Sequence, residues 1–160
     1  MAVSSPGILD TSGIPEMMDA FIVIVRTSWN SHVVDLLEKG CLEQLAQKKV
    51  RTKTIVVPGA VEITFAIKNY WERQERGELP HAFIALGCVI RGDTPHFEYV
   101  CNAVTQGVVQ LNLLLPVPTI FGILTVNDQA QADERTGGSH GHKGEEAAAT
   151  ALKMISLSQS

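Results

Sequence analysis

The alternation of short apolar runs with helical patterns constrains the fold of this chain most strongly. Four runs rich in β-branched and aromatic residues are each followed by a segment with amphipathic helical spacing. The expected strands cover residues 20–25, 52–57, 82–90 and 119–125, and the expected helices cover 31–47, 61–73, 95–113, 127–135 and 144–156. Strands that alternate with helices indicate a parallel sheet with helices on both faces, so we expect an α/β fold.

Length and composition predict one globular unit. A chain of 160 residues with 45% hydrophobic content can build a single core. Residues 1–19 are polar and interrupted by proline and glycine, so we expect a flexible N-terminal arm there. A single domain is expected over residues 20–157, because no internal repeat or second domain is visible.

The charged, apolar and metal-binding residue types exclude several classes of protein. A net charge of −4 and the dispersed positions of Lys and Arg argue against a nucleic-acid-binding protein. No apolar run has the length of a membrane span, and the first residues lack the pattern of a signal peptide. The cysteines, odd in number and without paired spacing, suit a reducing cytoplasm: Cys41, Cys88 and Cys101. His140 and His142 lack acidic or cysteine partners at ligand spacing, so we expect no metal.

Parallel α/β sheets bind ligands beyond the carboxyl ends of their strands, so the residues after each expected strand are candidates. The third strand runs into GCVIRGDTPHF (residues 87–97), a turn that leads into a helix. Helix N-terminal N–H groups and the helix dipole favour an anion there. His96 falls in the first turn, where the dipole disfavours protonation and leaves a neutral imidazole able to exchange protons. An ordinary strand–turn–helix unit with a solvated histidine is the alternative.

The first and second strands end in residues that suit a polar, planar ligand. Trp29 can stack on a ring, or else pack back onto the core. Asn30 can hydrogen-bond a ligand or cap the next helix. Gly59 and Ala60 leave the backbone open to a ligand, and Glu62 can accept hydrogen bonds from hydroxyls or merely complement a helix dipole.

Two cations follow the fourth strand. Asn127 is the expected N-cap of a short helix that Arg135 closes, and Lys143 opens the last helix. A glycine-rich interruption, residues 137–141, separates the two cations. Arg135 and Lys143 can together hold an anionic or carbonyl-rich ligand.

Four segments together resemble lumazine synthase in order and spacing. They are VPGAVEI (57–63), ALGCVIRGDTPHFEYVCNAV (85–104), FGILTVNDQAQADER (121–135) and HKGEEAA (142–148). The likeness covers residues 20–157 and implies a three-layer α/β/α, flavodoxin-like fold with a four-stranded parallel sheet in the order 2-1-3-4. RTSWN (26–30) resembles the family's first strand ending, but Ser28 directly precedes Trp29, which leaves any role of Arg26 open.

The resemblance implies a transferase of riboflavin biosynthesis. The family condenses 5-amino-6-(D-ribitylamino)uracil with 3,4-dihydroxy-2-butanone 4-phosphate, releases phosphate and water, and uses no metal or cofactor. The product, 6,7-dimethyl-8-ribityllumazine, is formed in the penultimate step of riboflavin synthesis.

The resemblance also implies a role for each site residue. One subunit would supply the residues around the pyrimidine and its ribityl chain: Trp29 for stacking, Asn30, Gly59, Ala60 and Glu62 for the ribityl chain, and Cys88, Val89 and Ile90 for the uracil edge. The same subunit would cradle phosphate with Asp93 and Thr94 and transfer protons with His96. The adjacent subunit would supply Phe121 over the ring, Arg135 for phosphate and Lys143 at the heterocycle.

Family members are pentamers or shells of twelve pentamers, so we expect a homopentamer with sites between subunits. The segment TGGSHGHKG differs from the GTKAGNKG-like sequence of shell-forming relatives, although its length matches. Two alternatives stay open: a non-catalytic binder of lumazine or flavin, and a generic flavodoxin-like signalling or nucleotide-binding domain. The presence of His96 and Arg135 favours the enzyme, and neither a receiver-type acidic cluster nor a phosphate loop is visible.

Overall fold

The structure is a computed structural model that describes residues 7–73 and 77–160. Along the described chain the elements are β1 (Phe21–Thr27), α1 (Ser31–Gln47), β2 (Arg51–Val57), α2 (Ala60–Arg73), β3 (Ala82–Ile90), α3 (His96–Leu114), β4 (Thr119–Val126), α4 (Gln129–Glu134), β5 (Thr136–Gly138), β6 (Gly141–His142) and α5 (Lys143–Ser158).

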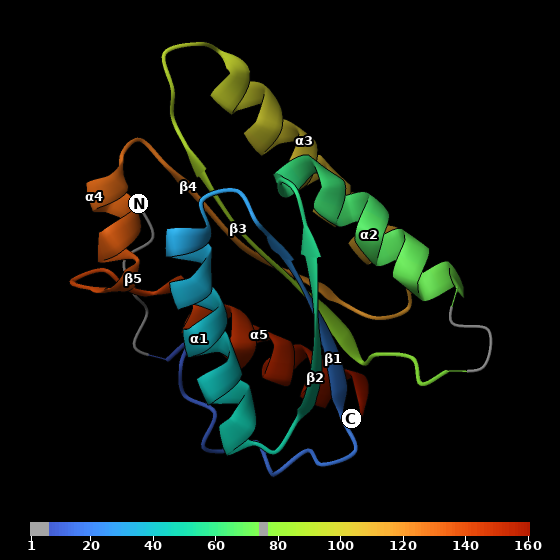
Figure 1. Cartoon of the computed structure of the whole chain (residues 1–160). Helices are drawn as coiled ribbons and strands as arrows, with labels where there is room; N and C mark the ends of the chain where they lie inside the picture. Colours follow the sequence, from blue (N-terminus) through green and yellow to red (C-terminus); the bar gives the residue numbers. More distant parts are fainter. Residues whose placement is uncertain (1–6, 74–76) are drawn as a thin grey trace.

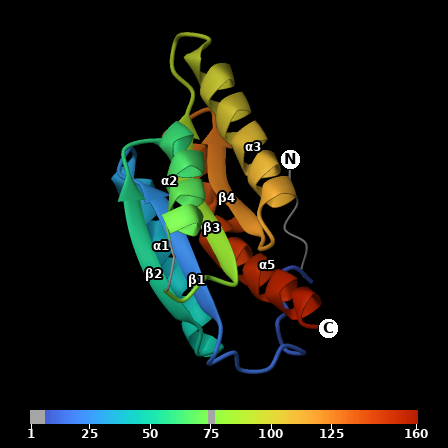
Figure 2. The same ribbon diagram turned by 90° about the vertical axis from the view of Figure 1, so that its right-hand side faces the viewer.

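The main sheet confirms the expected fold class. Within the described residues its strands are all parallel and follow the order β2-β1-β3-β4. Helices α1 and α5 cover one face, and α2 and α3 cover the other (Figures 1 and 2). This is the three-layer α/β/α arrangement, and it brings the carboxyl ends of all the strands to one edge.

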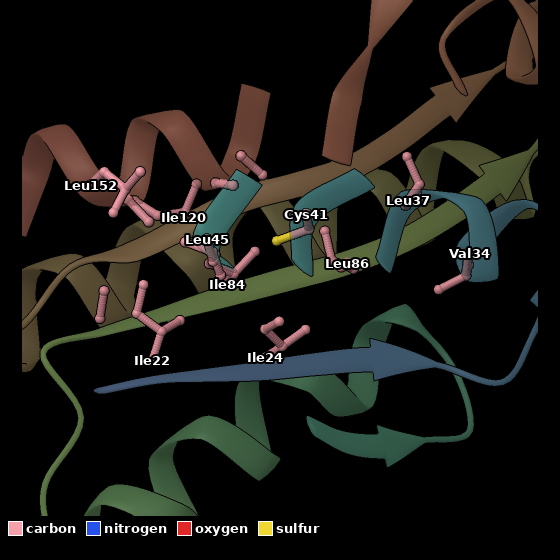
Figure 3. Close-up of a cluster of buried hydrophobic side chains, with 14 of the residues drawn as sticks. Ile22, Ile24, Val34, Leu37, Cys41, Leu45, Ile84, Leu86, Ile120 and Leu152 are labelled. Atoms are coloured by element: carbon pink, nitrogen blue, oxygen red, sulfur yellow. The ribbon is translucent and has the colours of Figure 1, made fainter. Parts of the chain in front are cut away.

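β3 is apolar throughout, and β1 is apolar from Phe21 to Val25, because both faces of these central strands are buried. In β1, Ile22 and Ile24 belong to the same buried cluster as Leu37 of α1 and Leu152 of α5 (Figure 3). The alternate residues of β1, with Val23 among them, face α2 and α3. The two cores explain why period-two alternation is absent from this part of the sequence.

The region after β4 differs from two expectations. Asp128, and not Asn127, caps α4, because its carboxylate accepts a hydrogen bond of 2.9 Å from the Gln131 N–H. An acidic cap also complements the helix dipole better than an amide does. The glycine-rich segment is not a plain interruption, because Thr136–Gly138 and Gly141–His142 pair as an antiparallel hairpin.

The N-terminal segment lies at the edge of the sheet opposite the carboxyl ends of the strands. The Lys153 ammonium donates to the carbonyls of Gly7 and Ile8 at 2.8 Å, and the Lys48 ammonium donates to Ile14 at 2.6 Å. Met17 is buried. Residues 1–6 lie outside the described residues, and the flexibility of residues 1–19 stays a prediction. No helix in residues 7–73 or 77–160 has the length and apolar character that a membrane crossing requires.

Candidate functional site

A cavity of about 480 Å³ opens where β1 and β3 end and α2 and α3 begin. This volume is in the range that holds a small-molecule ligand. Most of the residues predicted from the strand ends or implied by the resemblance line it: Trp29, Asn30, Gly59, Ala60, Glu62, Cys88, Val89, Ile90, Thr94 and His96. Thr27, Val61, Gly92, Phe97 and Val100 complete the wall, and sequence reasoning did not assign them to the site.

The turn between β1 and α1 presents an aromatic ring at the cavity. The Ser28 N–H donates to the Val57 carbonyl at 2.8 Å, and the Trp29 N–H donates to the Pro58 carbonyl at 3.1 Å. These bonds fasten the turn to the end of β2. Trp29 is 73% exposed, so the alternative in which it packs back onto the core is wrong. A solvated indole held on a fixed backbone is suited to stacking on a planar ligand.

Asn30 connects this turn to β3. Its side-chain amide donates to the Cys88 carbonyl at 2.8 Å, and its backbone is left-handed with φ 55°. Asparagine tolerates this conformation better than most residues. Asn30 occupies the N-cap position of α1, and its carbonyl accepts the first helical hydrogen bonds, but within the described residues its side chain makes no capping bond. The hydrogen bond to β3 instead fixes one wall of the cavity.

The turn between β2 and α2 combines an open backbone with a carboxylate. A Cβ on Gly59 would lie 2.9 Å from the Glu62 Oε2 atom, so a side chain at position 59 would push that carboxylate away. The Glu62 N–H also donates to the Gly59 carbonyl at 3.3 Å. Glycine at position 59 therefore lets Glu62 turn back over its own loop at the cavity wall.

Cys88 forms part of the floor as a neutral thiol. Burial raises the pKa of this thiol to about 11, so it stays protonated at neutral pH. A protonated thiol is a poor nucleophile. Cys88 therefore contributes volume and backbone groups to the cavity wall.

The turn between β3 and α3 places a histidine beside a helix N-terminus. His96 is the first residue of α3 and is exposed, and its N–H approaches the Thr94 hydroxyl oxygen at 3.4 Å. Pro95 stands at the N-cap position and offers no capping side chain, so the Thr94 hydroxyl, at the edge of hydrogen-bond range, is a side-chain acceptor beside the first turn. The first-turn N–H groups can therefore bind an oxyanion. Asp93 is exposed on the same turn, although it does not line the cavity.

Arg91 connects this turn to neighbouring elements through three contacts. Its Nε donates to the Asn127 side chain at 3.0 Å, its Nη1 pairs with Glu98, and its guanidinium lies 4.2 Å from the centre of the Phe97 ring. The pairing with Arg91 is the main reason that the pKa of Glu98 lies below its usual range. These contacts join the ends of β3 and β4.

Arg135 and Lys143, the two predicted cations, lie close to each other, but neither lines the cavity of the described chain. The Arg135 guanidinium donates to both carboxylate oxygens of Glu146, at 2.8 and 2.9 Å. The Lys143 ammonium lies 3.7 Å from the same carboxylate, and the Lys143 N–H donates to the Arg135 carbonyl at 2.8 Å. Phe121 is also away from the wall, in β4 opposite Ala85.

Sequence reasoning missed Glu146 as a partner of the cations. Burial raises the pKa of its carboxyl, but hydrogen bonding and the charge of Arg135, with help from Lys143, outweigh burial and lower the pKa overall. The sequence did hold a signal, since Glu146 follows Lys143 by three residues at the start of a helix, where such side chains are neighbours.

The fold and the cavity define a class: an α/β protein with a cavity at the carboxyl edge of a parallel sheet, sized for a small molecule and next to a helix N-terminus fit for an anion. A family model described as 6,7-dimethyl-8-ribityllumazine synthase matches residues 19–159. The chain belongs to this family, which confirms the resemblance and makes the protein an enzyme of riboflavin biosynthesis.

Similar proteins support the assignment along nearly the whole chain. A 6,7-dimethyl-8-ribityllumazine synthase of Parabacteroides distasonis is 43% identical over 152 residues, which cover 93% of this chain and 92% of the relative. A protein of the same name from Porphyromonas gingivalis is 46% identical over 151 residues, which cover 92% of this chain and 91% of the relative.

Proposed function

We propose that the cavity is the site at which this transferase forms 6,7-dimethyl-8-ribityllumazine. The family reaction condenses 5-amino-6-(D-ribitylamino)uracil with 3,4-dihydroxy-2-butanone 4-phosphate and releases phosphate and water, with no metal or cofactor. One observation carries the proposal: a single cavity of about 480 Å³ gathers an exposed indole, a carboxylate and an imidazole at a helix N-terminus.

The pyrimidine substrate binds between the turn at Trp29 and the end of β3. Trp29 stacks on the ring, and the backbone of Cys88, Val89 and Ile90 meets the uracil edge. The ribityl hydroxyls reach Glu62, whose carboxylate accepts hydrogen bonds from them. Asn30, Gly59 and Ala60 surround the chain, and their position on the cavity wall supports this placement.

The phosphate substrate binds at the N-terminus of α3. Thr94 offers its hydroxyl, and Asp93 and the first-turn residues offer backbone N–H groups to the phosphate oxygens. His96 exchanges protons during imine formation, phosphate elimination and ring closure, each of which moves a proton. Fixed donors around the departing phosphate stabilise the charge that develops on it. Holding two substrates together supplies much of the remaining acceleration.

A second copy of the chain completes the site with Phe121, Arg135 and Lys143. In their own chain these three side chains do not line the cavity of the described structure, which supports their supply by an adjacent copy. Apolar side chains exposed on α2 and α3 offer a surface for such an assembly: Val61, Phe65, Tyr99, Val109, Leu113 and Leu114. Exposed apolar patches of this kind mark protein–protein interfaces. The assembly is a homopentamer, alone or within a shell of twelve.

The enzyme works in the cytoplasm. Cys41, Cys88 and Cys101 are free, and unpaired cysteines suit a reducing compartment.

A direct assay tests the reaction. The protein is incubated with both substrates, and lumazine fluorescence is followed together with released phosphate. Equal amounts of the two products are expected, and each must depend on both substrates. Binding of the lumazine without release of phosphate would favour a non-catalytic binder instead.

A mixing experiment tests the shared site. His96→Ala and Arg135→Ala subunits are dissociated, mixed and reassembled, with each variant alone as the control. Because a His96→Ala subunit still offers Arg135 to its neighbour, mixed assemblies should regain activity. Assemblies shown to contain both variants that stay as inactive as the separate variants would refute a site shared between copies.

A further inference from the structure

Arg26 is a cation buried within β1. It is 8% exposed and lies on the face of the sheet that α1 covers. Neighbouring side chains on that face of β1, Ile22 and Ile24, belong to the apolar core. Removing an arginine from water costs several kcal/mol unless partners compensate for the loss, so its presence in a central strand requires a reason.

The contacts of Arg26 join both flanks of the turn that carries Trp29. Its Nη1 atom lies 2.6 Å from Asp35 Oδ1 and 2.6 Å from Glu38 Oε2, both on α1. Its Nη2 atom lies 3.4 Å from the Thr27 carbonyl, at the end of β1. Glu38 also accepts a hydrogen bond of 2.8 Å from the Thr54 hydroxyl of β2. The guanidinium thus connects β1, α1 and, through Glu38, β2.

This geometry is poor for stability alone. One nitrogen serves two carboxylates, and the buried Nε atom has no hydrogen-bond partner among the residues that the structure describes. The strongest arginine–carboxylate pairs instead use two parallel N–H donors on one carboxylate. A buried ion pair is in any case weak evidence for stabilisation. What the arrangement does achieve is to hold the strand end and the start of the helix at one spacing.

The residues between these two anchors are those at the cavity. The Thr27 hydroxyl donates to the Trp29 carbonyl at 3.1 Å, and Thr27 itself lines the cavity. Asn30 follows with its left-handed backbone, and α1 begins at the next residue. A change in the spacing of β1 and α1 would therefore shift Trp29 and Asn30.

We propose that Arg26 is a positioning residue that sets the orientation of Trp29 and Asn30 toward the pyrimidine ring. The inference rests on the proposed function for its kinetic consequences. Arg26 contacts β1 and α1, which flank the turn that carries Trp29. The proposed phosphate site belongs to another turn, the one before α3. The effect of Arg26 should therefore fall on the pyrimidine substrate and spare the phosphate substrate.

The test compares Arg26→Met, Arg26→Lys and the wild-type enzyme, with Arg51→Met as a matched control. Arg51 also pairs with a glutamate, Glu78, but near the opposite ends of the strands and half exposed. For Arg26→Met we expect the KM for the pyrimidine to rise about three- to tenfold, the value of one ordering hydrogen bond. The KM for the phosphate substrate should stay within about twofold, Arg26→Lys should recover part of the loss, and Arg51→Met should change neither constant.

A change of both KM values by the same factor, or a lower melting temperature with unchanged KM values, would overturn the proposal and leave Arg26 a structural residue. If Arg26→Met does not fold, Glu38→Gln provides the same comparison, because it removes one anchor of the guanidinium.

A readout independent of activity uses a Trp71→Phe background, in which Trp29 is the remaining tryptophan. There Arg26→Met should lower the fluorescence anisotropy of Trp29, and an unchanged anisotropy would refute the positioning role even if the proposed reaction fails.

Discussion

At Gly144 the backbone of α5 lies directly against the backbone of α1 at Leu37, and substituting this glycine tests how the last helix is held. A Cβ at this position would lie 2.0 Å from the Leu37 carbonyl oxygen and 2.8 Å from the Leu37 carbonyl carbon. Both are backbone atoms, which cannot rotate aside. Ordinary carbon–oxygen contacts are about 3.3 Å or longer, so in Gly144→Ala the two helices must separate by roughly 1.3 Å.

Two opposing effects set the change in the free energy of unfolding that Gly144→Ala causes. Overpacking of a close interface costs about 1–3 kcal/mol, and a clash between backbones belongs at the upper end. Alanine in a helix returns about 0.5–1 kcal/mol relative to glycine. We therefore expect Gly144→Ala to lower the free energy of unfolding by about 2 kcal/mol. In a domain of this size each kcal/mol shifts the Tm by about 2–4 °C, so the expected fall is about 4–8 °C.

The assay is thermal unfolding followed by circular dichroism at one fixed protein concentration, because assembly makes the Tm depend on concentration. Gly13→Ala is the matched control, since a Cβ there meets nothing within 4 Å. The control should melt at the wild-type temperature or slightly above it. A Gly144→Ala protein that melts like this control would refute the reasoning that backbone contact sets the spacing of α1 and α5.

Three further variants test the site. His96→Ala should lower kcat by about 10²-fold or less, because proximity of the substrates still accelerates the reaction; an unchanged kcat would remove His96 from proton transfer. Arg135→Ala should raise the KM for the phosphate substrate by about one to two orders of magnitude, matching ~1.5–3 kcal/mol for a charged hydrogen bond, and a change confined to the pyrimidine KM would contradict this role. Because the pKa of Glu146 is lowered in the fold, its carboxylate stabilises the protein fully above the usual glutamate range, and this stabilisation is lost as the pH falls through the lowered value. In denaturant titrations the stability lost in Glu146→Gln should therefore be constant near neutral pH and shrink in acid, whereas a pH-independent difference would argue against the ion pair.

Much of the candidate site was predictable because a parallel sheet collects its strand ends at one edge. Trp29, Gly59 and His96 are far apart in the sequence, yet each directly follows or nearly follows an apolar run, and all three line one cavity. The apolar runs themselves predicted the strands and the all-parallel sheet. What failed was local: Asn127 was expected as a helix cap that Asp128 provides, and of the two alternatives for Asn30 its side chain does not cap α1. A short polar side chain has several partners within reach, and only the folded backbone selects among them.

The sequence by itself determined the layers of the protein, the strand ends that surround the cavity and, through its motifs, the family. These follow from hydrophobic periodicity and short-range spacing. Both are local properties that can be seen in a segment of sequence without knowing what it packs against. The tertiary structure alone decided which charged groups on different elements pair. It brought Arg26 to Asp35 and Glu38, and it placed Glu146 on Arg135. Such pairs depend on how elements pack, because a side chain finds its partner through a distance of a few ångströms in space and not through a repeat in the sequence.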